Sequence, residues 1–169
     1  MSRALFVGRF QPFHMGHVLA IEEILRKHDH IIIIVGSARQ HDTPENPFSV
    51  KERIEMLTRS LLARGIRHFE IDSIEDFNDD KLWTSAIRDA YKFDAVYSRN
   101  PWTLECFGRN GVSAKKHRLY HKRKYSGVEI RKRMAAGKGW RDLVPAEVHG
   151  FIINIKGEER VRRLLAKQS

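Results

Sequence analysis

Short apolar runs alternate along this chain with longer segments in which apolar residues recur every three or four positions. This alternation predicts an α/β fold, in which a parallel sheet is flanked by helices. Residues 31–35 are apolar throughout, as expected of a strand that is covered on both faces, so we place this strand at the centre of the sheet. Strands are expected at residues 3–7, 30–35, 67–71, 95–97 and 112–115.

Helices are expected at residues 16–27, 50–63, 82–91 and 104–109, followed by a carboxy-terminal series that begins near residue 127. Two helix starts contain a capping box, in which a Ser hydroxyl and a Glu three residues later satisfy backbone N–H groups. The boxes are Ser49 with Glu52 and Ser126 with Glu129. A length of 169 residues without an evident linker predicts a single domain, in which residues 126–169 form a helical portion.

The net charge of the chain limits the classes of partner that we expect it to bind. It contains 31 Lys and Arg residues against 21 Asp and Glu, a formal net charge of +10. This excess favours anionic partners, which include nucleotides, nucleic acids and acidic membrane surfaces, and charge alone does not choose among them. The single Cys106 excludes an internal disulfide and a Cys-rich zinc cluster, and we expect it to be a buried structural thiol.

No apolar segment suggests a membrane. The longest wholly apolar run, residues 31–35, is far shorter than the roughly 20 residues that cross a bilayer. Residues 1–3 lead directly into the first expected strand, without an apolar leader or a cleavage site of small residues. We therefore expect a soluble, cytoplasmic protein.

A motif with two histidines follows the first expected strand. Residues 8–17 read GRFQPFHMGH and lead into a helix. In a doubly wound sheet this first crossover lies at the carboxyl edge, where ligands bind, and a helix amino terminus offers N–H groups to phosphate. His14 and His17 are three residues apart, so both can meet one polyphosphate, and Gly16 lets a phosphate approach the backbone. On spacing alone, two ordinary packed or surface histidines remain the alternative, and a metal pair lacks a recognisable third ligand.

The motif GRFQPFHMGH resembles the signature of the HxGH nucleotidyltransferase superfamily. A second superfamily element, usually written SxTxxR, resembles SGVEIR at residues 126–131, at the other capped helix start. Further segments resemble the archaeal-type nicotinamide-nucleotide adenylyltransferases: Gly36-Ser37-Ala38, Asn46-Pro47-Phe48 with Glu52-Arg53, Leu82-Trp83, Tyr97-Ser98 with Asn100-Pro101, and Leu143-Val144-Pro145. The resemblance covers nearly the whole chain and implies a Rossmann-like doubly wound parallel sheet of strand order 3-2-1-4-5, with a helical carboxy-terminal segment.

The resemblance implies that the 5′-phosphate of nicotinamide mononucleotide attacks the α-phosphorus of ATP, giving NAD and pyrophosphate, with Mg²⁺ bound to ATP. The catalytic residues that it implies are His14, His17, Arg9 and Arg131. The ATP-binding residues that it implies are Gly8, Arg9, Phe10, His14, Gly16, His17, Asn100, Tyr125, Ser126 and Arg131. No protein ligand to a metal is expected, and the family implies a homo-oligomer, often a hexamer.

The acceptor-binding residues implied by the resemblance are Gly36, Ser37, Phe48, Phe77, Asp80 and Trp83. Trp83 is expected to stack on the cationic nicotinamide ring, because residues 76–83 follow the third strand; a core tryptophan is the alternative. Trp102 and Trp140 are expected to be packing residues. Asp80 stands where the family often has Asn, and we expect it to accept from a carboxamide and repel a carboxylate. The alternative for Asp80 is that it caps the following helix.

Two residues depart from the family pattern. Val128 replaces the usual Thr of SxTxxR, which removes one hydroxyl contact to phosphate, and Arg99 replaces the Gly that is common before Asn100. The HxGH core specifies nucleotide transfer only, so phosphopantetheine, flavin and glycerol-phosphate acceptors remain alternatives. A nucleic-acid-binding module is a further alternative, suggested by six basic or His residues among residues 117–124, but a recognisable RNA-binding or helix-turn-helix motif is absent from the sequence.

Overall fold

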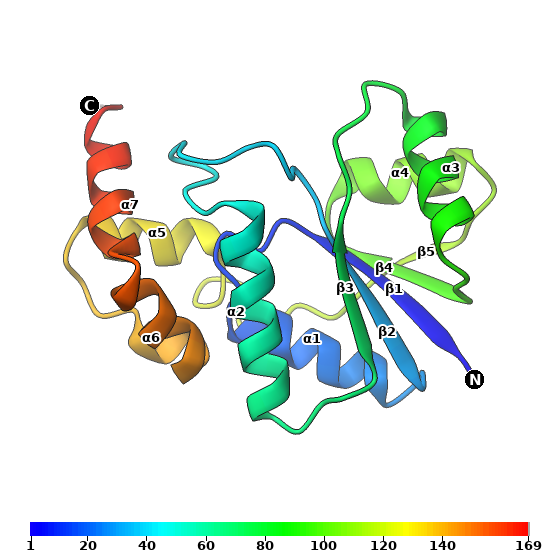
Figure 1. Cartoon of the computed structure of the whole chain (residues 1–169), viewed down its shortest axis with the longest axis horizontal. Coiled ribbons are helices and arrows are strands. Elements are labelled where there is room, and N and C mark those ends of the chain that lie inside the picture. The colour runs from blue at the N-terminus through cyan, green and yellow to red at the C-terminus, as the bar shows by residue number, and fades with distance from the viewer. Residues whose placement is uncertain (169) are drawn as a thin grey trace. The chain divides into compact units, whose positions relative to one another are not determined.

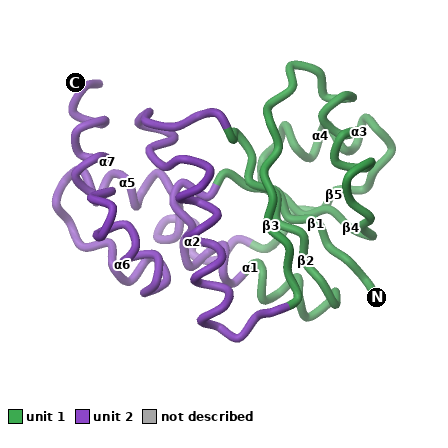
Figure 2. The backbone as a smooth tube through the Cα atoms, in the orientation of Figure 1, with its two compact units in different colours: residues 1–9, 20–38, 68–118 green, residues 10–19, 39–67, 119–169 purple. Residues whose placement is uncertain are grey.

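A computed structural model of the chain describes residues 1–168. The chain forms two compact units, each built from three separate segments (Figure 2). Unit 1 contains residues 1–9, 20–38 and 68–118, and unit 2 contains residues 10–19, 39–67 and 119 onward. Helix α1 (Met15–Leu25) belongs to both, because its first five residues fall in unit 2 and the others in unit 1.

Unit 1 contains the sheet. Within the described residues, five parallel strands lie in the order β3-β2-β1-β4-β5 (Figure 1). They are β1 (Arg3–Gly8), β2 (His30–Val35), β3 (Phe69–Ser73), β4 (Ala95–Ser98) and β5 (Ala114–Lys116). The predicted fold class and strand order are confirmed. The apolar strand β2 is buried and is paired on both edges, as expected of a central strand, and it lies next to the middle strand β1.

Helices α3 (Asp80–Ala90) and α4 (Pro101–Arg109) pack on one face of this sheet (Figure 1). Alternate strand residues point to that face, as the period of two requires, and form one apolar core with the helices. The core contains Leu5, Val7, Ile32, Ile34, Trp83, Ile87, Val96, Cys106 and Phe107. Cys106 is free and buried, as predicted, and burial raises the pKa of its thiol.

Unit 2 is helical. It contains α2 (Val50–Ala63), α5 (Gly127–Ala135), a 3₁₀ turn η1 (Arg141–Leu143), α6 (Ala146–Asn154) and α7 (Gly157–Ala166). Helix α5 packs against α7, and α2 packs against α6. The apolar side chains buried on α5, α6 and α7 are Ile130, Met134, Val148, Ile152, Val161 and Leu164. No helix within residues 1–168 combines the length and the apolar character that a bilayer span needs.

The two predicted capping boxes have different outcomes. At α2 the box is complete, because the Ser49 hydroxyl accepts from Glu52 N–H (3.2 Å) and Ser49 N–H donates to the Glu52 carboxylate (2.9 Å). At α5 the Ser126 hydroxyl accepts from Glu129 N–H (3.1 Å), but the Glu129 carboxylate accepts from Arg133 Nε (2.8 Å). The second box is therefore only half formed, since a neighbouring guanidinium on the same helix takes the carboxylate.

The predicted boundaries of helices and strands agree best with the structure where a capping or turn residue ends the apolar pattern. Strand β2 and helix α2 begin and end at the predicted residues. Strand β3 begins two residues later than predicted, because the Arg67 guanidinium closes the end of α2 by donating to the carbonyls of Leu62 (2.9 Å) and Ile66 (3.2 Å). Helix α4 begins at Pro101, earlier than predicted, because Asn100 caps it and a proline at the first helical position favours a helix start.

Candidate active site

The candidate residues fall into two groups, one in each unit. The group in unit 2 begins with the signature histidines, at the start of α1. The N–H groups of His17 and Val18 donate to the His14 carbonyl (3.0 and 3.2 Å), so the helix begins immediately after His14. The two imidazole rings stack, with centroids 3.6 Å apart and planes inclined by 24°. The predicted proximity of the two side chains is therefore present.

A backbone hydrogen bond sets the tautomer of His17. His14 N–H donates to His17 Nδ1 (3.2 Å), so Nδ1 is an acceptor and the neutral ring has its proton on Nε2. The ring is held between aromatic side chains: Phe13 lies parallel to it (centroids 5.6 Å apart) and Phe10 meets it edge-on (4.9 Å). Both phenylalanines are buried. They fix the imidazole in one orientation, and its Nε2–H can donate to an anion.

Close packing explains why residue 16 is a glycine, and the sequence did not suggest this explanation. A Cβ at this position would lie 3.0 Å from Cε1 of His14 and 3.1 Å from Cβ of Tyr125. A larger residue would therefore push the imidazole or the tyrosine away. Tyr125 thus lies against the first turn of α1, although the sequence separates the two by more than a hundred residues.

The start of α5 lies directly against the signature loop. Arg131 Nη1 donates to the Gln11 carbonyl (2.6 Å). A Cβ on Gly127 would lie 2.8 Å from that same Nη1 and 2.9 Å from that same carbonyl oxygen, closer than Cβ atoms normally approach. Glycine is therefore required at the first position of α5. The sequence predicted two phosphate-binding elements, but it did not indicate that they contact each other through Gln11.

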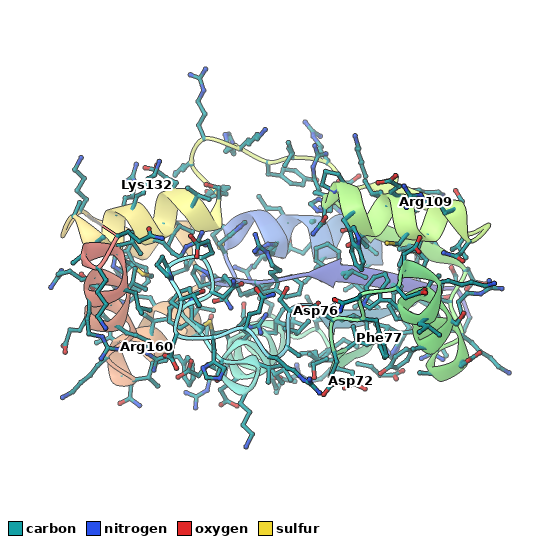
Figure 3. The ribbon with its side chains drawn as sticks, turned by 90° about the horizontal axis from the view of Figure 1, so that it is seen from above. Asp72, Asp76, Phe77, Arg109, Lys132 and Arg160 are labelled. Atoms are coloured by element: carbon teal, nitrogen blue, oxygen red, sulfur yellow. The ribbon has the colours of Figure 1, made fainter. Side chains whose placement is uncertain are left out.

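The segment that enters α2 is held by Gln11 and by Arg160. The Gln11 amide binds both backbone groups of Phe48, donating to its carbonyl (2.8 Å) and accepting from its N–H (3.0 Å). Arg160, on α7 (Figure 3), donates to the Pro47 carbonyl (3.1 Å) and to both carboxylate oxygens of Glu52 (2.7 and 2.9 Å). Burial opposes the ionisation of Glu52, but the hydrogen bonds from Arg160 and from the Ser49 backbone outweigh it and lower the pKa of this carboxyl.

The second group, in unit 1, includes the residues at the ends of β1, β2 and β4. Gly36 N–H donates to the Gly8 carbonyl (2.9 Å), and Ser37 has a positive φ of 50°. Arg9 is exposed. The Asn100 side chain, predicted to bind ATP, accepts from Trp102 N–H (2.9 Å) and so caps α4. An ATP-binding role for Gly8, Arg9 and Asn100 stays a prediction.

The predicted acceptor residues differ widely in exposure. Phe48, in unit 2, is fully buried, whereas Phe77, on the connection between β3 and α3 (Figure 3), is 38% exposed. Trp83 is only 2% exposed and meets Trp102 and Phe107 edge-on, so it is a core residue in this conformation. Stacking on nicotinamide therefore requires that Trp83 become uncovered, and it stays a prediction. Trp102, predicted to pack, does pack edge-on against Trp83, although it lies in the first turn of α4 and is 43% exposed.

Asp80 does not cap α3. The carboxylate of Asp79 accepts from the N–H groups of Lys81 (2.9 Å) and Leu82 (3.0 Å), so Asp79 is the N-cap and Asp80 is the first helical residue. The Asp80 carboxylate lies 3.7 Å from Nη1 of Arg109, at the end of α4 (Figure 3). The capping alternative for Asp80 is therefore wrong, and its carboxylate remains a candidate for contact with an acceptor.

Comparison with known proteins agrees with the motifs. A model of the cytidylyltransferase-like family matches residues 5–133. Curated nicotinamide-nucleotide adenylyltransferases from Methanolobus tindarius and Methanoculleus marisnigri are 41% and 42% identical to the chain, over 96% and 97% of its length and 94% and 98% of theirs. The chain belongs to the nicotinamide-nucleotide adenylyltransferase family.

A solved structure supports the fold of this family member. The chain is similar to a bifunctional NMN adenylyltransferase/ADP ribose pyrophosphatase from Francisella tularensis, crystallised with AMP and a manganese ion, with a TM-score of 0.81 and 22% identity. The match covers 99% of this chain but spans only about half of that protein (52%). At this identity the likeness concerns the fold alone.

The two departures from the adenylyltransferase family pattern have different surroundings. Val128, in the first turn of α5, is 55% exposed, so its isopropyl group replaces the missing hydroxyl at a solvent-facing position. Arg99 donates to the His117 carbonyl (2.9 Å) and so ties the end of β4 to the beginning of the basic segment 117–124. Arg99 therefore has a structural contact that a glycine cannot make.

Proposed function

We propose that this chain is a nicotinamide-nucleotide adenylyltransferase, which joins ATP and nicotinamide mononucleotide to give NAD and pyrophosphate. The observation that supports this most is the stacked pair of His14 and His17 at the start of α1, in a chain of this family. Both imidazoles lie where a helix amino terminus also offers N–H groups and a positive dipole end. Such an arrangement suits a polyphosphate.

The proposed reaction needs no general base, because the attacking phosphate of nicotinamide mononucleotide is already anionic at neutral pH. Catalysis then consists of positioning the two reactants in line and stabilising charge on the α-phosphate and the departing pyrophosphate. His17 suits the second task, since its Nε2–H is a donor whose ring is fixed by Phe10 and Phe13. We assign the transition-state contact to His17 and a ground-state phosphate contact to His14.

The start of α5 is proposed to bind the β- and γ-phosphates. Ser126 supplies a hydroxyl, and the first turn of α5 supplies backbone N–H groups. Arg131 adds a guanidinium, whose planar fork suits phosphate oxygens and whose orientation is fixed by the Gln11 carbonyl. Tyr125, packed beside Gly16, is proposed to contact the nucleotide from the same segment.

Mg²⁺ is proposed to accompany ATP. The candidate phosphate-binding groups are imidazoles, guanidinium groups and backbone N–H groups, which bind phosphate oxygens and are not the oxygen ligands that Mg²⁺ prefers. Within residues 1–168, no three His, Cys, Asp or Glu side chains gather into a metal-binding cluster. The phosphates themselves would hold the ion, which when bound neutralises part of their charge. We assign no protein ligand to it.

The acceptor is proposed to be the amide, nicotinamide mononucleotide, rather than its acid analogue. Asp80 supports this choice, since a carboxylate accepts from a carboxamide and repels a second carboxylate. Its pairing with Arg109 at 3.7 Å orients the carboxylate. The Asp80→Asn variant should prefer the amide acceptor over the acid acceptor less strongly than the unaltered chain does. The preference is measured as the ratio of kcat/KM for the two acceptors. Equal efficiency of the unaltered chain with both acceptors would contradict the proposal.

The decisive assay offers ATP and Mg²⁺ with each candidate acceptor in turn and follows pyrophosphate release. NAD formation from nicotinamide mononucleotide is expected, and turnover only with a phosphopantetheine, flavin or glycerol-phosphate acceptor would redirect the assignment within the superfamily. His17→Ala should fold normally and lose about 10²-fold or more in kcat. Steeply salt-dependent binding to DNA or RNA without any ATP turnover would favour the nucleic-acid alternative.

The assembly state and location stay predictions that follow from the family resemblance. We propose a homo-oligomer in the cytoplasm. Light scattering at the protein concentration of the assay measures the number of subunits. A monomer that is fully active under those conditions would contradict the proposed assembly.

A further inference from the structure

Gln11 lies at the meeting point of three segments of unit 2. It is in the loop between β1 and α1, and the residue is 5% exposed. Its partners are 37 residues away, at Phe48, and 120 residues away, at Arg131. Phosphate recognition does not explain this residue, because both ends of its amide are already bonded to protein.

The Gln11 side-chain amide pairs with the backbone of Phe48 as a peptide group of a neighbouring strand would. Its Nε2–H donates to the Phe48 carbonyl at 2.8 Å, and its Oε1 accepts from the Phe48 N–H at 3.0 Å. A primary amide offers a donor and an acceptor together in the same plane, as the two backbone groups of Phe48 require. Phe48 itself is fully buried, so loss of either bond leaves a backbone group without a partner where water does not reach.

The Gln11 backbone binds the other segment. Its carbonyl accepts from Arg131 Nη1 at 2.6 Å and lies where it excludes any Cβ on Gly127. His14 follows three residues later in the same loop. A shift of Gln11 therefore changes the position of the guanidinium and that of the histidines together.

The Phe48 segment is a fixed reference for this arrangement. Arg160 donates to the Pro47 carbonyl at 3.1 Å and pairs with Glu52 in the first turn of α2. The segment is thus anchored to α7 independently of Gln11. The bonds of the Gln11 amide connect the signature loop to that anchored segment.

From these contacts we infer that Gln11 is a positioning residue for the nucleotide site, which aligns Arg131 with His14, at the end of the loop, and His17, in the first turn of α1. The inference rests on the proposed function in one respect, namely that these residues bind ATP. Gln11 itself touches no reacting atom. Because misplacement by about 1 Å can cost as much as 10²-fold in rate, small shifts at Gln11 should be measurable at the substrate.

The first test measures ATP binding by calorimetry, with Mg²⁺ and without any acceptor. Gln11→Met keeps the length of the side chain and removes both bonds to Phe48, and we expect ATP affinity to fall about tenfold. Gln168→Met is the matched control, because Gln168 is an exposed residue of the carboxy terminus, and its ATP affinity should be unchanged. Circular dichroism at the assay temperature verifies that both variants are folded. Unchanged ATP affinity in folded Gln11→Met would overturn the inference.

The second test separates positioning from a general structural role. If Gln11 aligns Arg131 with the histidines, then adding Gln11→Met to Arg131→Ala should lower ATP affinity by a smaller factor than Gln11→Met does in the unaltered chain. Independent structural damage would instead multiply the two losses in ATP affinity, and that result would contradict the inference. Both measurements use ATP alone. They therefore remain informative if nicotinamide mononucleotide is not the acceptor, in which case the assay with each acceptor fails while the ATP-binding result stands.

A third variant tests the hydrogen bonds of the Gln11 side chain through the effect of pH on ATP affinity. Gln11→Glu keeps the shape and one acceptor but places a carboxylate against the Phe48 carbonyl. When protonated, that carboxyl regains a donor, and burial beside a carbonyl favours the protonated form. The ATP affinity of Gln11→Glu relative to the unaltered chain should therefore be closer to normal at pH 6 than at pH 8, both values chosen for the experiment. A ratio that does not change with pH would count against the assigned hydrogen bonds.

Discussion

The pair of Arg160 and Glu52 provides the sharpest stability prediction. Arg160 makes two hydrogen bonds to the Glu52 carboxylate, at 2.7 and 2.9 Å, and one to the Pro47 carbonyl at 3.1 Å. The Arg160 and Glu52 side chains are 21% and 20% exposed. Arg160→Met keeps much of the aliphatic stem and removes all three bonds, so it isolates the contribution of the guanidinium.

The magnitude follows from these contacts. A hydrogen bond to a charged group contributes about 1.5–3 kcal/mol, but partial solvent access and the ordering of long side chains reduce the sum for a pair such as this one. We expect Arg160→Met to lower the free energy of unfolding by about 2 kcal/mol. For a chain of this length that corresponds to a decrease in Tm of roughly 4–8 °C. Arg162→Met is the matched control on the same helix, because its pair with Glu158 is 51% exposed at the arginine, and it should cost roughly 0.5 kcal/mol or less.

The pH dependence tests the ionic part of this contribution. Since the pKa of Glu52 is lowered in the folded chain, the pair stabilises the fold fully above the ordinary glutamate pKa. That contribution is lost as the pH falls through the lower folded value. The stability difference between Arg160→Met and the unaltered chain, measured by thermal and urea unfolding, should therefore shrink between about pH 7 and pH 3. An equal difference at both pH values, or one no larger than that of Arg162→Met, would refute the reasoning.

Two further predictions concern other parts of the chain. Gly127→Ala places a Cβ 2.8 Å from Arg131 Nη1 and 2.9 Å from the Gln11 carbonyl, and because that carbonyl is backbone, we expect a loss of about 1–3 kcal/mol in unfolding free energy and weaker ATP binding. Normal stability and ATP affinity would show that α5 can shift without consequence. Burial lowers the pKa of half-buried His117, and the nearby Arg99 adds to this, so its NMR titration midpoint should lie below the ordinary histidine value. Because the folded chain disfavours the charged imidazole, His117 destabilises the fold as the pH falls below the ordinary histidine pKa and does not do so above it. A titration midpoint at or above the ordinary value would contradict this prediction.

The sequence predicted those features that depend on local patterns. The apolar run of β2 ends at Gly36, and the Ser49 cap fixes the start of α2, so both elements match residue by residue. The alternation of runs predicted the parallel sheet, and the resemblance predicted its strand order. Local hydrogen-bonding and steric signals such as these are visible in a few consecutive residues.

Features that depend on distant partners could not be predicted. Gln11 is a neutral polar residue in a loop, and nothing near it in the sequence indicates that it binds Phe48 and Arg131. The burial of Trp83 likewise depends on Trp102 and Phe107, which α4 supplies. The location of Trp83 after the third strand was predictable, whereas the covering of its ring was not.

The interleaving of the two units restricts how the gene for such a chain can be divided. Each unit consists of three segments that alternate along the sequence, and α1 contributes its first turn to one and its remainder to the other. No continuous stretch therefore encodes either unit. Truncation at any internal position removes parts of one unit or of both, so neither can be expressed as a simple fragment or exchanged with a relative by a single crossover. Expressing one unit by itself would therefore require new connections that join its three segments.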